Sequence, residues 1–178
     1  MRNLAIFFLC VSSVFAAGEL SGRRAPGFAL LDVMTMKYHD PADYRGKVLI
    51  IDIMQSNCPH CADFARVLEK VKAKYGAQVA ILSITNPPDS QQAVGEFKRK
   101  HNVTVPILYD CGQVAGSYLK ITPQRPSFNI PHVFLIDRQG IIRNDFGYGP
   151  LTANIFEGDG IFAEIDKLLG GSQPAGKK

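Results

Sequence analysis

Apolar and polar residues follow one another along this chain in patterns that predict strands and helices in turn. Two nearly continuous apolar runs, 47–54 and 78–85, are typical of strands buried on both faces. Between and after them, apolar residues at helical spacing with charged residues between them predict helices over 62–75 and 91–101. Gly76 is well suited to end the first of these helices.

Shorter patterns complete the succession of elements. Pro106 limits its segment to a strand or a sheet edge, because proline donates no backbone hydrogen bond. The remaining elements are a hairpin at 28–33 and 36–39, a turn or single helical turn at 40–46, the strand or edge segment 103–109, a helix at 113–119, a hairpin at 132–137 and 141–143, and a final helix at 155–169. This order predicts an α/β fold with a central mixed β-sheet flanked by helices.

The two ends of the chain differ from the part between them. Residues 1–16 have a short positive start, an apolar run and small residues at 14 and 16, which together predict a signal peptide cleaved after Ala16. The apolar run is shorter than the roughly 20 residues of a membrane-spanning helix, so an uncleaved anchor is the second interpretation. Residues 26–169 are expected to form one domain and 170–178 a disordered tail. The protein is accordingly expected in the periplasm or outside the cell.

Composition narrows the choice of partners. Removing residues 1–16 lowers the formal net charge from +4 to +3, because Arg2 is the one charged residue among them. This mild excess and the absence of a dense basic block argue against nucleic acid as a partner. Three of the four cysteines remain after cleavage, namely Cys58, Cys61 and Cys111. An odd number of cysteines in an exported protein leaves one thiol without an obvious role.

The sequence Cys58-Pro59-His60-Cys61 lies where the first buried strand gives way to the first helix. The unpaired backbone N–H groups and the dipole at a helix N-terminus favour a thiolate on the first sulfur. Because the thiolate is the form that attacks disulfides, we expect Cys58 to be the nucleophile and Cys61 the resolving thiol. Zinc sites share this spacing, but the strand before it and the helix after it favour redox chemistry.

These features together resemble the thioredoxin fold, in particular its exported TlpA/ResA-like branch. The resemblance covers about residues 26–169 and rests on the strand–CxxC–helix unit, Ile130-Pro131 before a strand, the 137–140 turn, and the insert at 87–109. It implies a thioredoxin fold with an N-terminal β-hairpin and an inserted strand-helix element. It also implies thiol–disulfide exchange without a cofactor, by a monomer acting on protein or peptide thiols and served by a membrane or periplasmic redox partner.

The resemblance assigns further residues to the site. It implies that Pro131 is cis and packs opposite the CxxC motif, and that the backbone of Ile130 pairs with an extended peptide. His132 would then lie at the rim, where it could tune Cys58 or join a metal site. The alternative is an ordinary hydrogen-bonded histidine at the start of a strand.

Asp52 is a lone carboxylate in an apolar strand, six residues before Cys58. Thioredoxin has a buried acid at the matching place. Desolvation raises the pKa of such a group, which suits it to accept a proton from Cys61. A surface-facing or salt-bridged aspartate is the alternative interpretation.

Two departures leave the direction of electron flow open. The chain has no tryptophan, and Asn57 and Met54 occupy the places where the family usually has one. Pro59-His60 is the pair found in strongly oxidising DsbA-type proteins, in which a histidine stabilises the thiolate. Proteins that share the TlpA-like fold features, in contrast, usually act as reductants. We therefore expect an intermediate reduction potential.

Two other functions have some support in the same residues. Cys58, Cys61 and His132 could bind Cu(I) or Zn(II) in a periplasmic metallochaperone, although a fourth ligand is not evident. A peroxiredoxin-like peroxidase shares much of the fold. However, Ser56 and Asn57, the two residues before Cys58, do not match the motif that precedes the reactive cysteine of such enzymes. Cys111 could be a third catalytic thiol, but the interpretation we favour is an inert buried one, since free cysteine is usually buried.

Overall fold

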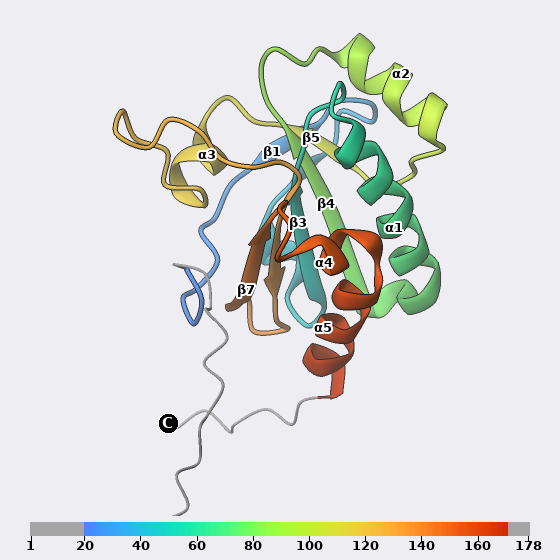
Figure 1. Ribbon diagram of the computed structural model, residues 1–178, viewed down its shortest axis with the longest axis vertical. Helices are drawn as coiled ribbons and strands as arrows, with labels where there is room; N and C mark the ends of the chain where they lie inside the picture. Colours follow the sequence, from blue (N-terminus) through green and yellow to red (C-terminus); the bar gives the residue numbers. More distant parts are fainter. Residues whose placement is uncertain (1–19, 171–178) are drawn as a thin grey trace, which may run out of the picture.

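One mixed sheet runs through the part of the chain described by the computed structural model, residues 20–170. Its seven strands lie in the order β2-β1-β5-β4-β3-β6-β7 (Figure 1). Strand β3 is parallel to β4 and antiparallel to β6, and β5 is parallel to β4. The strands are β1 (Leu30–Asp32), β2 (Tyr38–His39), β3 (Val48–Ile53), β4 (Val79–Thr85), β5 (Ile107–Tyr109), β6 (His132–Ile136) and β7 (Ile142–Gly147).

Helices cover both faces of this sheet (Figure 1). Side chains of α1, α2, α4 and α5 pack on one face, and those of α3 on the other. The helices are the 3-10 turn η1 (Pro41–Tyr44), α1 (Pro59–Tyr75), the 3-10 turn η2 (Gly76–Gln78), α2 (Gln91–His101), α3 (Gln113–Ser117), α4 (Ala153–Glu157) and α5 (Asp159–Gly170). This arrangement is the predicted thioredoxin-like fold.

Strand β3 connects the two cores of the molecule. All six of its residues are buried, as the continuous apolar run predicted. Because side chains alternate between the faces of a strand, Val48 and Ile50 join the cluster under α1, whereas Leu49 and Ile51 join the cluster under α3. The segment that carries Cys58 therefore follows directly from a fully buried central strand.

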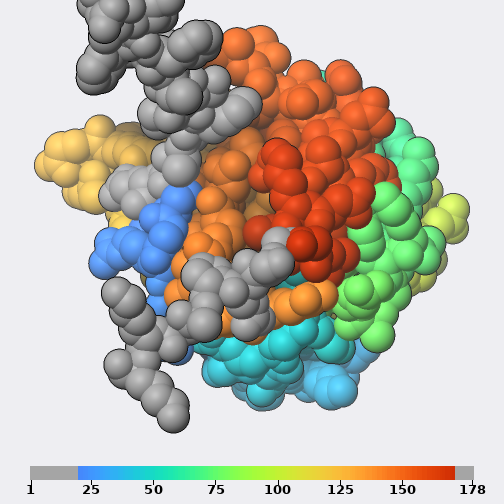
Figure 2. Space-filling view, turned by 90° about the horizontal axis from the view of Figure 1, so that it is seen from below, coloured from blue at the N-terminus to red at the C-terminus, as the bar shows by residue number. Residues whose placement is uncertain are grey.

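The C-terminal helix closes the face that carries α1. The hydroxyl of Tyr75, at the end of α1, donates hydrogen bonds to the backbone oxygen of Phe162 at 3.2 Å and to the Asp166 carboxylate at 2.7 Å. Seen from below, α5 (red) lies beside the green residues that follow α1 (Figure 2). Among residues 20–170, no helix combines the length and apolar character needed to cross a membrane.

The structure corrects several predicted boundaries. Helix α1 begins at Pro59 rather than at residue 62, because Pro59 suits the first helical position and Cys58 caps it. Of the two predicted alternatives for 103–109, the structure has a strand inside the sheet, between β1 and β4, and it begins at Ile107, after Pro106, rather than at residue 103. The predicted final helix is two helices, broken where Gly158 adopts a φ of 124°. The predicted signal peptide and the 171–178 part of the predicted tail lie outside the described residues.

Candidate active site around Cys58 and Cys61

Cys58 caps the N-terminus of α1. Its sulfur accepts a hydrogen bond from the backbone N–H of Cys61 at 3.2 Å. This contact places Sγ among the N–H groups that a helix leaves unpaired at its start, where negative charge is stabilised. Cys58 is partly exposed and both cysteines are free thiols. The first cysteine is therefore accessible and its thiolate is supported by the backbone.

Cys61 lies beneath Cys58 and is almost fully enclosed, with 1% of its surface exposed. Burial raises the pKa of its thiol far above the usual range, and the negative charge of Asp52 and a hydrogen bond with Cys58 act in the same direction. These surroundings favour the protonated form of Cys61.

Asp52 lies on the same face of the sheet as Cys61. Strand alternation places its side chain with those of Val48 and Ile50, under α1. It is 2% exposed, and burial raises the pKa of its carboxyl from 3.8 to about 7, while a hydrogen bond from Ser83 Oγ at 3.1 Å opposes that rise. The other carboxylate oxygen has no partner among the described residues. The surface-facing and salt-bridged alternatives for Asp52 do not fit this placement.

His60, inside the CxxC motif, belongs to an aromatic stack. The ring of His60 stacks on Tyr148, with ring centroids 4.2 Å apart, and Tyr148 meets the edge of Phe156 at 5.5 Å. The sequence indicated that the usual tryptophan surface was missing but did not identify Tyr148. No motif marks this tyrosine, and its contact with His60 becomes evident only in the structure.

Asp89 anchors the loop that leads to Cys58. Its carboxylate accepts hydrogen bonds from the backbone N–H of Ser56 at 2.8 Å and from the Ser56 hydroxyl at 2.6 Å. It also accepts one from the hydroxyl of Thr85 at the end of β4. Asp89 is 7% exposed, so these bonds satisfy a buried charge. The sequence places Asp89 in the insert at 87–109, but no motif in it indicates this anchoring role.

The Ile130-Pro131 segment lies beside the same loop. Its peptide bond is cis, and the Pro131 carbonyl accepts a hydrogen bond from the backbone N–H of Tyr148 at 3.0 Å. The next residue, His132, pairs with Ile53 in the sheet, and Ile130 lines a hollow of about 240 Å³ together with Met54 and Gln55. The predicted peptide-binding backbone is therefore next to the residues that precede Cys58.

His132 is not at the rim of this site, contrary to the prediction. Its ring stacks on Phe134 at 4.8 Å and its Nε2 lies 3.0 Å from the Asp145 carboxylate, on the face of the sheet that carries α3. Within residues 20–170, no group of three His, Cys, Asp or Glu side chains could hold a metal ion. The ligand set of Cys58, Cys61 and His132 is thus not assembled, and His132 is an ordinary hydrogen-bonded histidine.

Cys111 also departs from expectation. The prediction of an inert buried thiol is wrong, because Cys111 is exposed. It lies between the end of β5 and the start of α3, where Gly112 adopts a φ of 119° and turns the chain. The general tendency of free cysteine toward burial therefore does not hold in this turn.

Comparison with known proteins agrees with this fold. The chain is similar to the thioredoxin-like protein YneN of Bacillus subtilis, with 24% identity over 142 residues, 79% of this chain and 78% of YneN.

Two solved structures illustrate the similarity of fold. One is the thioredoxin domain of a thiol-disulfide oxidoreductase from Bacteroides vulgatus, with a TM-score of 0.64 and 14% identity over 82% of this chain and 97% of that one. The other is a secreted disulfide oxidoreductase of Mycobacterium tuberculosis homologous to E. coli DsbE, with a TM-score of 0.56 and 20% identity over 69% of this chain and 84% of that one. Residues 21–145 match the model of the AhpC/TSA family, and because this match spans well over half of the chain, the protein belongs to that family.

Proposed function

We propose that this protein is an exported thiol–disulfide oxidoreductase that exchanges disulfides with protein thiols through Cys58 and Cys61. The observation that carries the proposal is the pairing of an accessible, helix-capping Cys58 with a buried Cys61 whose backbone N–H donates to the Cys58 sulfur at 3.2 Å. This is the arrangement that a nucleophile and a resolving thiol require.

In the reducing direction, the Cys58 thiolate attacks one sulfur of a substrate disulfide. A bond forms between Cys58 and that sulfur, and the other substrate sulfur leaves as a thiolate that takes a proton from water. The N–H groups at the start of α1 stabilise the Cys58 thiolate before attack. The ring of His60, in the first turn of α1, stacks on Tyr148.

Cys61 completes the exchange. Its proton passes to the Asp52 carboxylate, and the new thiolate attacks Cys58, which releases the second substrate thiol and leaves a Cys58–Cys61 disulfide. Two electrons have then moved to the substrate. A buried base is needed because burial and the charge of Asp52 raise the pKa of the Cys61 thiol. The same steps in reverse oxidise a substrate dithiol.

The backbone of Ile130 is the proposed docking edge for the substrate. It lies beside Met54 and Gln55, next to the loop that carries Cys58. Main-chain pairing at such an edge recognises an extended segment with little dependence on its side chains, which suits a general exchanger of protein thiols.

Three cysteine variants test the proposal. We expect Cys58→Ala to abolish exchange with a peptide disulfide, and Cys61→Ala to accumulate mixed disulfides that are detectable by mass. Cys111→Ala, which removes an exposed thiol outside the motif, is the matched control and keeps full activity. Full activity in Cys58→Ala would refute the mechanism. Reduction of hydrogen peroxide much faster than peptide exchange would instead assign the peroxidase function.

The direction of electron flow follows from the reduction potential of the Cys58–Cys61 pair. Equilibration with glutathione buffers followed by thiol trapping measures it. A value near that of DsbA, about −120 mV, would assign an oxidant, and a value near that of thioredoxin, about −270 mV, a reductant. Export is tested separately by the N-terminal sequence of the protein recovered from cells, which begins at Ala17 if the predicted signal peptide is cleaved.

A further inference from the structure

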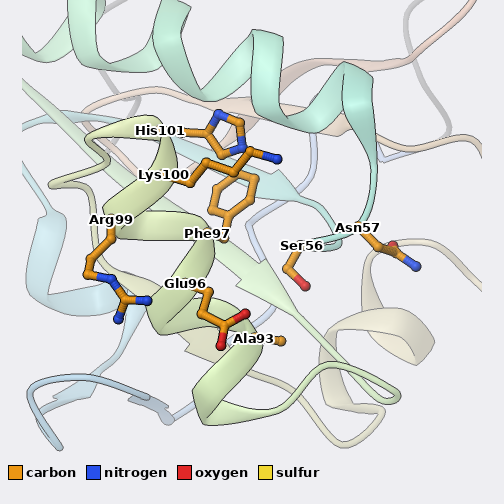
Figure 3. A pocket seen from close by; sticks show the side chains of 8 residues that line it. All are labelled: Ser56, Asn57, Ala93, Glu96, Phe97, Arg99, Lys100 and His101. Atoms are coloured by element: carbon orange, nitrogen blue, oxygen red, sulfur yellow. The ribbon is translucent and has the colours of Figure 1, made fainter.

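A second hollow borders the active-site loop on the side of α2. Ser56 and Asn57, the two residues before Cys58, form one wall, and α2 forms the other (Figure 3). Its volume is about 570 Å³, more than twice that of the hollow beside Ile130. The hollow therefore begins immediately next to the proposed nucleophile.

The two hollows flank the same loop. Met54 and Gln55 line the one that contains Ile130, and Ser56 and Asn57 line the one beside α2. An extended peptide advances about 3.3 Å per residue. A substrate segment that pairs with Ile130 and places its cysteine at Cys58 would, within a few residues, continue into the hollow beside α2.

Helix α2 forms a firm wall for this hollow. Phe97 is 4% exposed and belongs to the core under α1, and the side chain of Ser90 caps the helix by accepting a hydrogen bond from the Ala93 N–H at 3.1 Å. The ring of His101 rests against Phe97, with centroids 4.9 Å apart. The hollow is thus largely preformed, which lowers the entropy lost on binding.

Positive charge predominates in the lining. Arg99 and Lys100 are exposed on α2, and Glu96 is the one acid among the described residues that line the hollow. The side-chain amide of Gln92 donates a hydrogen bond to Glu96 at 3.0 Å.

The neighbouring basic residues contribute less. Lys98 turns away from the hollow and donates to the Val105 carbonyl at 2.5 Å. Partial burial, Lys100 and Arg66 lower the pKa of His101, so at neutral pH the positive charge rests on Arg99 and Lys100.

From this geometry we infer that the hollow between the Ser56–Asn57 wall and α2 binds acidic residues of the substrate that lie close to its reacting cysteine. The preferred substrates are then proteins with an Asp or Glu within a few residues of the disulfide. This inference rests on the proposed exchange function and adds a substrate preference to it.

The test compares three short peptides as disulfide-linked homodimers, identical except that two aspartates, two lysines or two serines flank the cysteine. The protein used is the Cys61→Ala/Cys111→Ala variant. Formation of the mixed disulfide on Cys58 is measured over time by mass spectrometry of the proteolytic fragment that carries Cys58. Exposed charge pairs contribute about 0.2–1 kcal/mol each, so the rate constant for the aspartate peptide should exceed that for the lysine peptide by about three- to tenfold. Raised salt should reduce this ratio.

Charge-neutralising substitutions then test whether the residues that line the hollow cause the preference for the aspartate peptide. Arg99→Gln/Lys100→Gln should reduce the ratio to about one, and Glu96→Gln should increase it. Lys47→Gln, at the opposite end of β3, is the matched control and should leave the ratio unchanged.

Equal rate constants for the aspartate and lysine peptides, or a preference that persists in Arg99→Gln/Lys100→Gln, would overturn the inference while leaving the exchange function intact. Failure of all three peptides, including the serine peptide, would overturn the exchange function itself.

Discussion

The imidazole of His60 stacks on the ring of Tyr148, with the ring planes 22° apart. Tyr148 also donates its backbone N–H to the carbonyl of Pro131. One residue directly after β7 therefore connects the centre of the CxxC motif with the segment proposed to bind the substrate. A change at either end of this connection is expected to affect the other.

Replacing His60 should make the protein a stronger reductant. A histidine beside the Cys58 thiolate favours the reduced form, so His60→Ala should lower the reduction potential. A loss of about 1 kcal/mol of thiolate stabilisation corresponds to about 20 mV. Tyr148→Ala, which removes the ring that holds the imidazole, should lower the potential by a smaller amount, as measured in glutathione buffers.

Tyr148→Phe is the control for this prediction, because it keeps a stacking ring and the backbone hydrogen bond to Pro131. Its potential should match that of the unmodified protein. An unchanged reduction potential in His60→Ala would show that the imidazole does not stabilise the Cys58 thiolate, even though it stacks on Tyr148.

Asp52→Asn should separate the two steps of exchange. In the proposed mechanism the carboxyl of Asp52, with a pKa of about 7, accepts the Cys61 proton during resolution and does not take part in the first attack. Near pH 7.5 the variant should resolve mixed disulfides about ten- to a hundredfold more slowly, while rapid-quench measurements show nearly unchanged formation of the mixed disulfide. Equal slowing of both steps would contradict the role as a proton acceptor.

The same substitution should alter how stability depends on pH. Because the folded-state pKa of Asp52 lies above its ordinary 3.8, the native state keeps a proton that the unfolded state loses between about pH 4 and pH 7. The free energy of unfolding therefore falls as pH rises through this window. For a carboxyl that is 2% exposed, a shift from 3.8 to about 7 amounts to about 4 kcal/mol when complete.

Chemical denaturation of the reduced protein at pH 5 and pH 8 measures this effect. Between these two values the unmodified protein should lose about 2–3 kcal/mol more than Asp52→Asn, which has no carboxyl to ionise at this position. Ser83→Ala, which removes the hydrogen bond to Asp52, is a useful control because it leaves the carboxyl in place and should retain the pH dependence. Identical pH dependence in Asp52→Asn and the unmodified protein would mean that Asp52 is already ionised at pH 5.

The sequence predicted those parts of the site that depend on local pattern. The apolar run before Cys58 specified strand β3, and a lone acid within that run marked Asp52 as buried. His132 shows the limit of such reasoning. Strand periodicity groups it with Phe134 and Ile136, but periodicity alone does not tell which face of the sheet carries α1.

Tyr148 and Asp89 could not be identified in this way, because their roles arise from contacts between segments far apart in the sequence. The bond between Asp89 and Ser56 spans 33 positions, and no spacing rule links the two residues. The sequence indicates the insert that carries Asp89 only through the family resemblance. Because β3 and β4 pair side by side, the segments that follow them meet, and Asp89 there holds the loop before Cys58.

Weakening the Asp89 anchor should slow the first attack beyond any loss of stability. Asp89→Asn removes the charge from a carboxylate that holds the backbone and hydroxyl of Ser56 and the hydroxyl of Thr85. We expect it to lower the free energy of unfolding by about 1–3 kcal/mol, as for other buried groups that lose charged hydrogen bonds. Ser56→Ala, which loses only the hydroxyl contact, should have a smaller effect.

The rate of attack by Cys58 distinguishes positioning from stability alone. Ile165→Val, a substitution in the core of α5 away from the loop, should reduce stability by about 0.5–1.5 kcal/mol and leave the rate of mixed-disulfide formation unchanged well below the melting temperature. Asp89→Asn should reduce that rate under the same conditions, because the residues that lead into the nucleophile are no longer fixed. If both variants react at the unmodified rate, Asp89 stabilises the fold without positioning Cys58.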